Sequence, residues 1–486
     1  MPILTNLIRS LSKYEVRIIR SITQITGNVE NKKRDQLFEL IHKGSDEEDV
    51  AKSIGYRSAK VPAYINLCQR LQQDILNALL IVQQAPDEDL PFLQAQFSCR
   101  RALLFADILQ SRNCFEEADS LLERTSRTAK RSELFAEQVL INDLRRNTPS
   151  VQQNPALFNQ LSQSLLQMHS IQGNVLKARQ MHYELLSPEL IRSVSMADFQ
   201  QKGMQRLNEM LFHLGQSPSG RLNFYYHLAA MNFHTTIRSF ADAEKHGGEL
   251  LKLISENSLL QSDGNIAAVN IELSGINLAG GNNQTAGIFA QQAIDAGGLA
   301  AEQRLQAFRL LALSQFRSGD YNAAAATITT ALRRKDSSVN PLAESRLRLL
   351  HAAVALEQKS YKDSAGMIAR CCELTNDHRG WMPGYFLLDL QLNLERGLID
   401  VAEHRFDAFR HSVRRHQLDG KNGDQRLSAI LFLLNRLFKL NIGYKNLNEK
   451  ESQRINLLHQ NENDYWWNPA GYELIRFDQW LLNRAG

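Results

Sequence analysis

Residues with chemically useful side chains are scattered along this chain, and none forms a catalytic pattern. Gly280–Asn283 is glycine-rich but lacks the Lys-Ser/Thr pair that a phosphate-binding loop requires. Cys371 and Cys372 occupy a core-facing position of a predicted helix, where packing is the expected role and redox chemistry the alternative. The segment His411–His416 is basic, which suits the end of a helix because the helix dipole favours cations there. Without a nucleophile, an acid–base pair or metal-ligand spacing, the sequence predicts no enzyme, no cofactor and no metal site.

Length and composition suit a folded protein without a membrane span. The chain has 486 residues, 43% of them hydrophobic and 22% charged, and a formal net charge of +4. This charge is too small to indicate nucleic-acid binding by itself. Its most apolar stretch, 427–440, is interrupted by polar residues and is shorter than the roughly 20 residues of a spanning helix. The five cysteines show no CxxC spacing, and we expect a cytoplasmic protein.

Helical periodicity runs through nearly the whole chain, with polar or glycine-containing breaks, so the predicted fold class is all-α. The clearest internal repeat is Ala307–Lys335. In it the small residue Ala312 lets a second helix approach closely, Gly319 ends the first helix, and Tyr321 follows the turn. The second helix then presents Ala324, Ile328 and Ala331.

The same order recurs on both sides of this repeat. The turn positions Asn283, Tyr321, Tyr361 and Ile399 are spaced by 38, 40 and 38 residues. The pattern resembles that of tetratricopeptide (TPR) repeat proteins over about residues 90–410, with extra helices expected near 132–146 and 197–214. The resemblance implies an α-solenoid of antiparallel helix pairs. Residues 425–486, which include Trp466 and Trp467, are predicted to form a helical C-terminal cap.

In TPR proteins the first helix of each pair lines a concave surface that binds a protein or peptide. Carried over by position, the resemblance implies that three arginines with apolar neighbours face an extended or acidic peptide, because arginine pairs well with carboxylates. The alternative is that these arginines only solubilise the surface. The Lys/Asn set of carboxylate-clamp repeats is not matched. The predicted partner-binding residues are Gln306, Arg309, Phe316, Arg317, Arg346, Leu349, Leu387 and Gln391.

Residues 1–84 form a separate predicted helical domain. Ala51, Gly55 and Val61 have the spacing of a helix-turn-helix motif, in which glycine permits a tight turn. Pro62 is comfortable only in the first turn of a helix, so we expect the second helix to begin near Val61. The domain holds 12 Lys and Arg against 9 Asp and Glu, which is weakly basic. If it binds DNA, the predicted contacts are Arg57, Lys60, Tyr64, Asn66 and Arg70.

The layout is similar to that of bacterial TPR-containing proteins with a short helical N-terminal domain. The sequence therefore leaves two functions open. In the first, the chain is a scaffold that binds a protein segment on the concave face. In the second, it is a transcription regulator in which residues 1–84 read DNA and the repeats sense a partner. A small helical bundle that does not touch DNA is the alternative reading of residues 1–84. The partner's identity and the oligomeric state do not follow from the sequence.

Overall fold

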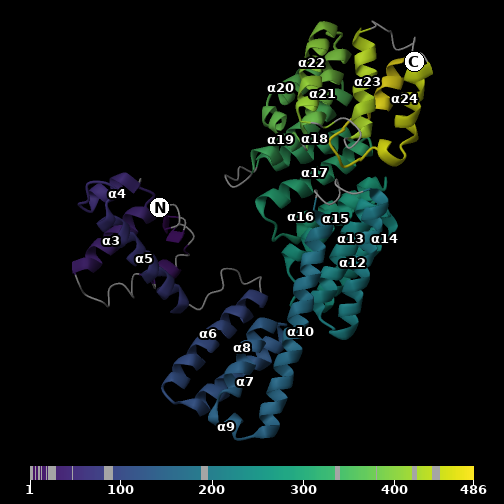
Figure 1. Cartoon of the computed structure of the whole chain (residues 1–486). Coiled ribbons are helices and arrows are strands. Elements are labelled where there is room, and N and C mark those ends of the chain that lie inside the picture. The colour runs from purple at the N-terminus through teal and green to yellow at the C-terminus, as the bar shows by residue number, and fades with distance from the viewer. Residues whose placement is uncertain are drawn as a thin grey trace. The chain divides into compact units, whose positions relative to one another are not determined.

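The computed structural model contains helices and no strand in the residues that it describes, which confirms the all-α fold class. The structure describes residues 29–485 apart from 46, 82–90, 188–194, 334–339, 379, 417, 419–423 and 440–448. Nearer the N-terminus it describes residues 4–5, 7–8, 11, 14–17 and 19. Contacts divide the chain into two units, Met1–Ser162 and Gln163–Gly486, called unit 1 and unit 2 here (Figure 1). None of the described helices has the length and apolarity that a membrane span requires.

Unit 1 begins with a small helical core. It contains α3 (Val29–His42), α4 (Glu47–Ser53) and α5 (Pro62–Ile81). Helix α5 begins at a proline, as expected, since proline has no amide hydrogen to donate and suits the first helical position. Side chains from all three helices meet in one apolar cluster, which includes Leu37, Val50, Leu71 and Ile75.

The rest of unit 1 consists of helices joined by tight turns. They are α6 (Pro91–Ser111), α7 (Phe115–Arg131), α8 (Phe135–Arg146), α9 (Pro149–Gln152) and the first part of α10 (Pro155–Leu186), a helix that contains the boundary between the units. Asn113 and Glu133 have φ values of 61° and 46°, and each lies two residues before the next helix. Arg145 on α8 forms an ion pair with Asp119 on α7, with 2.8 Å between Nε and Oδ1.

Unit 2 is built mainly from consecutive helix pairs, which follow α12 (Met196–Gln216) (Figure 1). The turn inside each pair has one residue with positive φ, two positions before the second helix. These residues are Arg238, Gly281, Gly319, Lys359 and Gly397. The pairs are α13 (Gly220–Thr236) with α14 (Phe240–Glu256), α15 (Asp263–Ala279) with α16 (Asn283–Ala296), α17 (Ala301–Arg317) with α18 (Tyr321–Arg333), α19 (Pro341–Glu357) with α20 (Tyr361–Ile368), and α21 (Met382–Glu395) with α22 (Ile399–Arg415).

Small residues bring neighbouring helices of unit 2 close together. The hydroxyl of Ser274 on α15 donates to the carbonyl of Ala286 on α16, 2.8 Å away. At Gly247 on α14, an added Cβ would lie 2.4 Å from a methyl carbon of Leu273 on α15, so no larger residue fits without movement. These contacts explain why small residues recur at fixed places in the repeats.

Unit 2 ends with α23 (Gln425–Lys439), α24 (Glu449–Gln460), the short 3₁₀ helix η2 (Asn463–Tyr465) and α25 (Phe477–Ala485). Phe477, Trp480 and Leu481 of α25 belong to the same buried apolar cluster as residues of α15 to α22. The C-terminal helices therefore share the hydrophobic core of the repeats.

Candidate protein-binding face

A stretch of unit 2 near its C-terminus lies against the first helices of the repeats. We call residues Asn461–Arg476 the C-terminal segment; apart from η2 it has no regular secondary structure. Arg309 on α17 donates to the carbonyl of Ala470, at 3.3 Å between nitrogen and oxygen. Gln391 on α21 donates to the carbonyl of Ile475, at 3.4 Å. The repeats thus bind this segment partly through its main chain.

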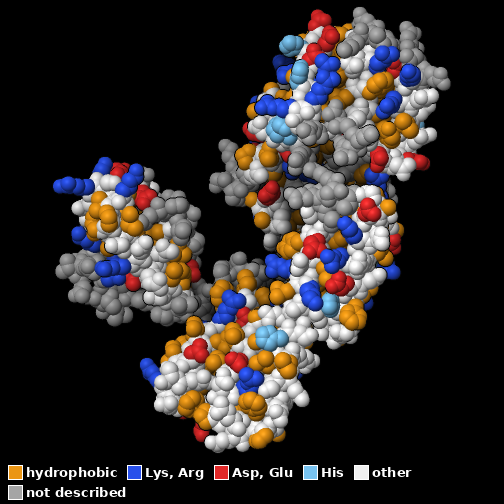
Figure 2. Space-filling model, in the orientation of Figure 1, with side chains coloured by type: hydrophobic (Ala, Val, Ile, Leu, Met, Phe, Trp, Pro, Cys, Tyr) orange, Lys and Arg blue, Asp and Glu red, His pale blue; other side chains and the backbone are white. Residues whose placement is uncertain are grey.

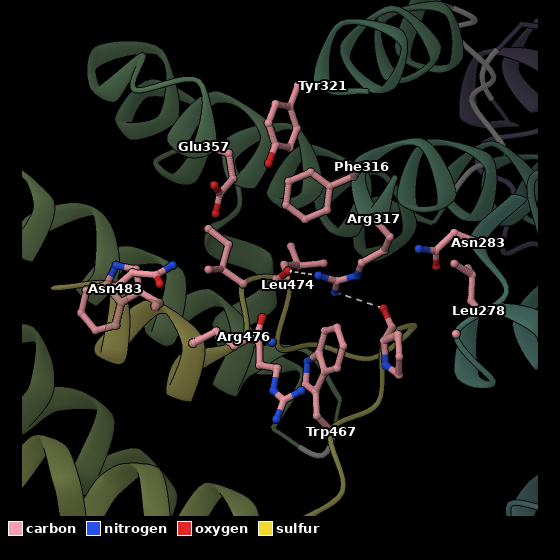
Figure 3. A pocket seen from close by; sticks show the side chains of 15 residues that line it. Leu278, Asn283, Phe316, Arg317, Tyr321, Glu357, Trp467, Leu474, Arg476 and Asn483 are labelled. Carbon is pink, nitrogen blue, oxygen red and sulfur yellow. Dashed lines mark hydrogen bonds between the residues drawn. The ribbon is translucent and has the colours of Figure 1, made fainter. Parts of the chain in front are cut away.

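Arg317, the last residue of α17, contacts the segment at three residues. Its two terminal nitrogens donate to the carbonyls of Leu474 at 2.7 Å and Pro469 at 3.1 Å, as Figure 3 shows. The guanidinium carbon also lies 4.4 Å from the ring centroid of Trp467, where a cation is attracted by the ring face. Burial lowers the pKa of Arg317 to about 10, with Glu473 acting in the opposite direction, so the side chain stays charged at neutral pH.

Arg309 and Arg346 share an aromatic surface on unit 2. Their guanidinium carbons lie 5.2 and 6.0 Å from the ring centroid of Trp381. Arg346 also forms an ion pair with Asp377, with 2.9 Å between nitrogen and oxygen. Burial, and then the charge of Arg346, lower the pKa of Arg309 to about 10. The arginines predicted to face a partner therefore already contact carbonyls, a ring or a carboxylate of this chain.

The other predicted partner-binding residues separate into two groups. Leu349 and Leu387 lie in the core with exposed fractions of 0% and 3%, so they pack the repeats and do not present a binding surface. Phe316 has an exposed fraction of 6%, and it borders the pocket described below. This corrects the predicted set, since adjacent helical positions point about 100° apart and only some of them share a face. Gln306 is exposed. We call Arg309, Arg317 and Gln391, together with Arg238 described next, the segment-binding face.

Arg238 extends this face to the first of the repeat pairs. Its guanidinium donates to the carbonyl of Asn463 at 2.7 Å and lies 4.6 Å from the ring centroid of Trp466. The ring of Phe240 lies on the same tryptophan, at 6.1 Å between centroids. The sequence pattern does not indicate Arg238, and it predicts Trp466 and Trp467 only as part of a C-terminal cap. Its place in the turn does distinguish Arg238, because it occupies the turn position at which three other repeats have glycine.

A pocket of about 470 Å³ lies between the C-terminal segment and the turns of the repeats (Figure 3). Phe316, Arg317 and Tyr321 line one side of it, and Trp467 and Pro469 of the segment line another. Glu357 also borders it. The pKa of Glu357 is raised because neighbouring atoms desolvate the carboxylate and Glu395 repels its charge. The pocket thus combines aromatic walls with groups of both charges.

The inner end of the C-terminal segment is fixed by a buried ionic network. Arg426 on α23 donates to both carboxylate oxygens of Glu473, at 2.6 and 2.9 Å, and to Asp478 at 2.9 Å. It also donates to the carbonyls of Leu458 and Tyr465. Burial alone would lower the pKa of Arg426, but the two carboxylates together raise it. The network ties α23 to α25 through the segment.

The predicted DNA contacts of unit 1 lie on and beside α5. Arg57, Lys60, Asn66 and Arg70 are exposed. Tyr64 has an exposed fraction of 1% and packs edge-on against Tyr56, so its predicted DNA contact is corrected to a core position. Residues 54–61 separate α4 from α5, which is longer than the three- to four-residue turn of a helix-turn-helix motif. DNA binding by unit 1 stays a prediction.

Charge does not mark a binding region on the visible surface. On the face that Figure 2 shows, Lys and Arg side chains are interspersed with Asp and Glu over both units. Cys371 is buried and Cys372 is exposed, and neither is in a disulfide. The candidate site is therefore defined by the contacts of the C-terminal segment.

Comparison with known proteins gives little beyond these observations. No protein-family model and no curated protein matches the sequence. Among solved structures, the one described as the apo form of RapI is similar, with a TM-score of 0.46 and 14% sequence identity. The match covers 67% of this chain and 87% of that one. A likeness of this degree identifies neither a family nor a function.

Proposed function

We propose that unit 2 is a non-enzymatic scaffold whose segment-binding face holds an extended stretch of another protein. The observation that carries the proposal is the way the face holds the C-terminal segment. Arg238, Arg309, Arg317 and Gln391 all donate to main-chain carbonyls. Every extended polypeptide offers such acceptors, so the same donors can bind a segment of different sequence.

The arginine chemistry supports a protein partner over an acidic small molecule. A planar guanidinium can donate to two acceptors at once, and Arg317 does so with the carbonyls of Pro469 and Leu474. Hydrogen bonds to a charged donor are stronger than neutral ones. The face therefore combines affinity for a main chain with little demand for particular side chains at these positions. An acidic partner, as first expected, is not required.

The test is direct binding of a labelled peptide that copies residues 461–476 to the full chain, measured by fluorescence anisotropy. The variant R309A/R317A removes donors to Pro469, Ala470 and Leu474. We expect it to weaken binding about tenfold or more, since each charged hydrogen bond contributes roughly 1.5–3 kcal/mol.

The matched control is R304A, on the same helix. Arg304 donates to the carbonyl of Leu299 beside its own helix start. It should leave peptide binding unchanged. Equal measurable affinity of the wild-type chain, R304A and R309A/R317A would overturn the assignment of this face. Because the chain's own segment occupies the face, segment binding itself is overturned by absence of binding in these three chains and in W466A/W467A.

A further inference from the structure

Two adjacent tryptophans of the C-terminal segment each pack on an arginine of unit 2. We call these two contact sites, at Arg238 and at Arg317, the seats. Trp466 lies on Arg238 and Phe240, at 4.6 Å from the guanidinium carbon and 6.1 Å between ring centroids. Trp467 lies on Arg317, at 4.4 Å. In each seat an arginine of a repeat contacts the ring and also donates to a nearby carbonyl of the segment. Each seat thus recognises an aromatic side chain together with its main chain.

We propose that the partner of this face is an extended protein segment with two adjacent aromatic residues, for which Trp466 and Trp467 act as a resident competitor. The inference rests on the proposed function and specifies its ligand class. Both seats act through cation–aromatic attraction and carbonyl hydrogen bonds. Tyrosine, phenylalanine or tryptophan of a partner can satisfy the first, and any main chain can satisfy the second.

The segment has two parts that differ in how firmly they are held. In the outer part, Asn461–Asn468, residues Glu462, Asn463, Asp464 and Asn468 are exposed and both tryptophans are only partly buried. In the inner part, Leu474 and Ile475 have exposed fractions of 3% and 9%, and Glu473 is bound to buried Arg426. Two hydrogen bonds join the outer part to this anchor, one from Arg426 to the carbonyl of Tyr465 and one from the indole of Trp467 to the carbonyl of Glu473. The outer part leaves its seats when these two bonds break, while the inner part and α25 stay in the core.

The pocket provides room for the exchange. It borders Trp467 and Pro469 of the segment and Phe316 and Tyr321 of the repeats. Its volume of about 470 Å³ is large enough for an aromatic side chain of an incoming segment. A partner segment can thus begin to bind beside Trp467 before the resident tryptophans have left.

The test compares two chains and two peptides. The variant W466A/W467A empties both seats, and the labelled peptide copies residues 461–476 with its tryptophans or with alanine in their place. We expect the tryptophan peptide to bind the variant about tenfold more tightly than the wild-type chain, because the competitor is gone. The alanine peptide should bind both chains at least tenfold more weakly than the tryptophan peptide binds the variant.

Controls separate this inference from the proposed function and from misfolding. F212A removes an exposed aromatic side chain of α12 (62% exposed) and should bind like the wild-type chain. R238A in the W466A/W467A background removes one seat and should lower the gained affinity, and circular dichroism checks that each variant is folded. If both peptides bind both chains equally, the aromatic seats are refuted while segment binding stands. If no peptide binds any chain, the proposed function fails as well.

Discussion

Replacing Arg426 by methionine should destabilise unit 2 strongly. The side chain of Arg426 is 4% exposed, and those of its partners Glu473 and Asp478 are 5% and 0% exposed. Methionine preserves much of the arginine's apolar length but provides no charge and no donor. Both carboxylates then stay buried without their main cation.

The expected loss of stability follows from this burial. Removing one partner of a buried ion pair typically costs about 3–5 kcal/mol, because the remaining charge is desolvated without compensation. Arg476 still donates to Asp478 in the variant, and the amide of Phe477 still donates to Glu473. We therefore expect about 3 kcal/mol, near the lower end of that range.

The tryptophans provide the assay. All four of them, at positions 381, 466, 467 and 480, lie in the part of unit 2 that contacts the C-terminal segment or packs in its core. Urea unfolding followed by tryptophan fluorescence thus reports on unit 2 and not on unit 1. A loss of about 3 kcal/mol lowers the urea midpoint by roughly 1 M, for a slope of about 3 kcal/mol/M.

The control is R348M, which removes an ion pair with Glu344 whose side chains are 36% and 34% exposed. Such a surface pair contributes at most about 1 kcal/mol. A triple variant, R426M/E473Q/D478N, removes the stranded charges and should recover part of the loss. If R426M and R348M lower the midpoint equally, the buried network does not stabilise unit 2 and the reasoning is refuted.

Three further predictions concern unit 2. G247A should destabilise unit 2 by about 1–3 kcal/mol in urea unfolding, because the new methyl group would overlap Leu273; its neighbour Gly248 has open space, so G248A should stabilise by up to about 1 kcal/mol, and equal effects would contradict the packing argument. Burial lowers the pKa of His182 to about 4, so the neutral form is favoured in the folded state and stability should be lost as pH falls from about 6.5 towards 4; H182Q should flatten that part of the thermal-unfolding profile, and an unchanged profile would count against it. K359G should raise the melting temperature, because Lys359 has a φ of 61° that strains a residue with a side chain; a lower melting temperature would show that the turn is not strained.

The repeat architecture could be predicted because it depends on local patterns. The repeat Ala307–Lys335 covers the later part of α17 and the whole of α18, with Gly319 in the turn, and Tyr321 is the first residue of α18. The extra helices expected near 132–146 and 197–214 are α8 and α12. Helical periodicity and turn residues act over a few positions, so the sequence shows them directly.

The contacts of the C-terminal segment could not be predicted, because they join residues far apart in the chain. Arg317 and Leu474 are hydrogen-bonded across 157 positions. The network of Arg426 could not be predicted from the sequence either, since an arginine in an apolar helix usually indicates an exposed position. Phe316 and Arg317 were predicted to share a face, but neighbouring residues of a helix point in different directions: Phe316 is buried, and Arg317 donates to the segment.

The placement of the C-terminal segment has a consequence for the order of folding during synthesis. The ribosome makes α17 to α22 before it makes the residues that contact Arg309 and Arg317. Synthesis proceeds at roughly 5–20 residues per second, so the apolar side of the repeats stays exposed to water for several seconds before α25 can cover it. We therefore expect chaperones to engage nascent chains that lack residues 461–486, and the repeats to become fully protected only after these residues emerge.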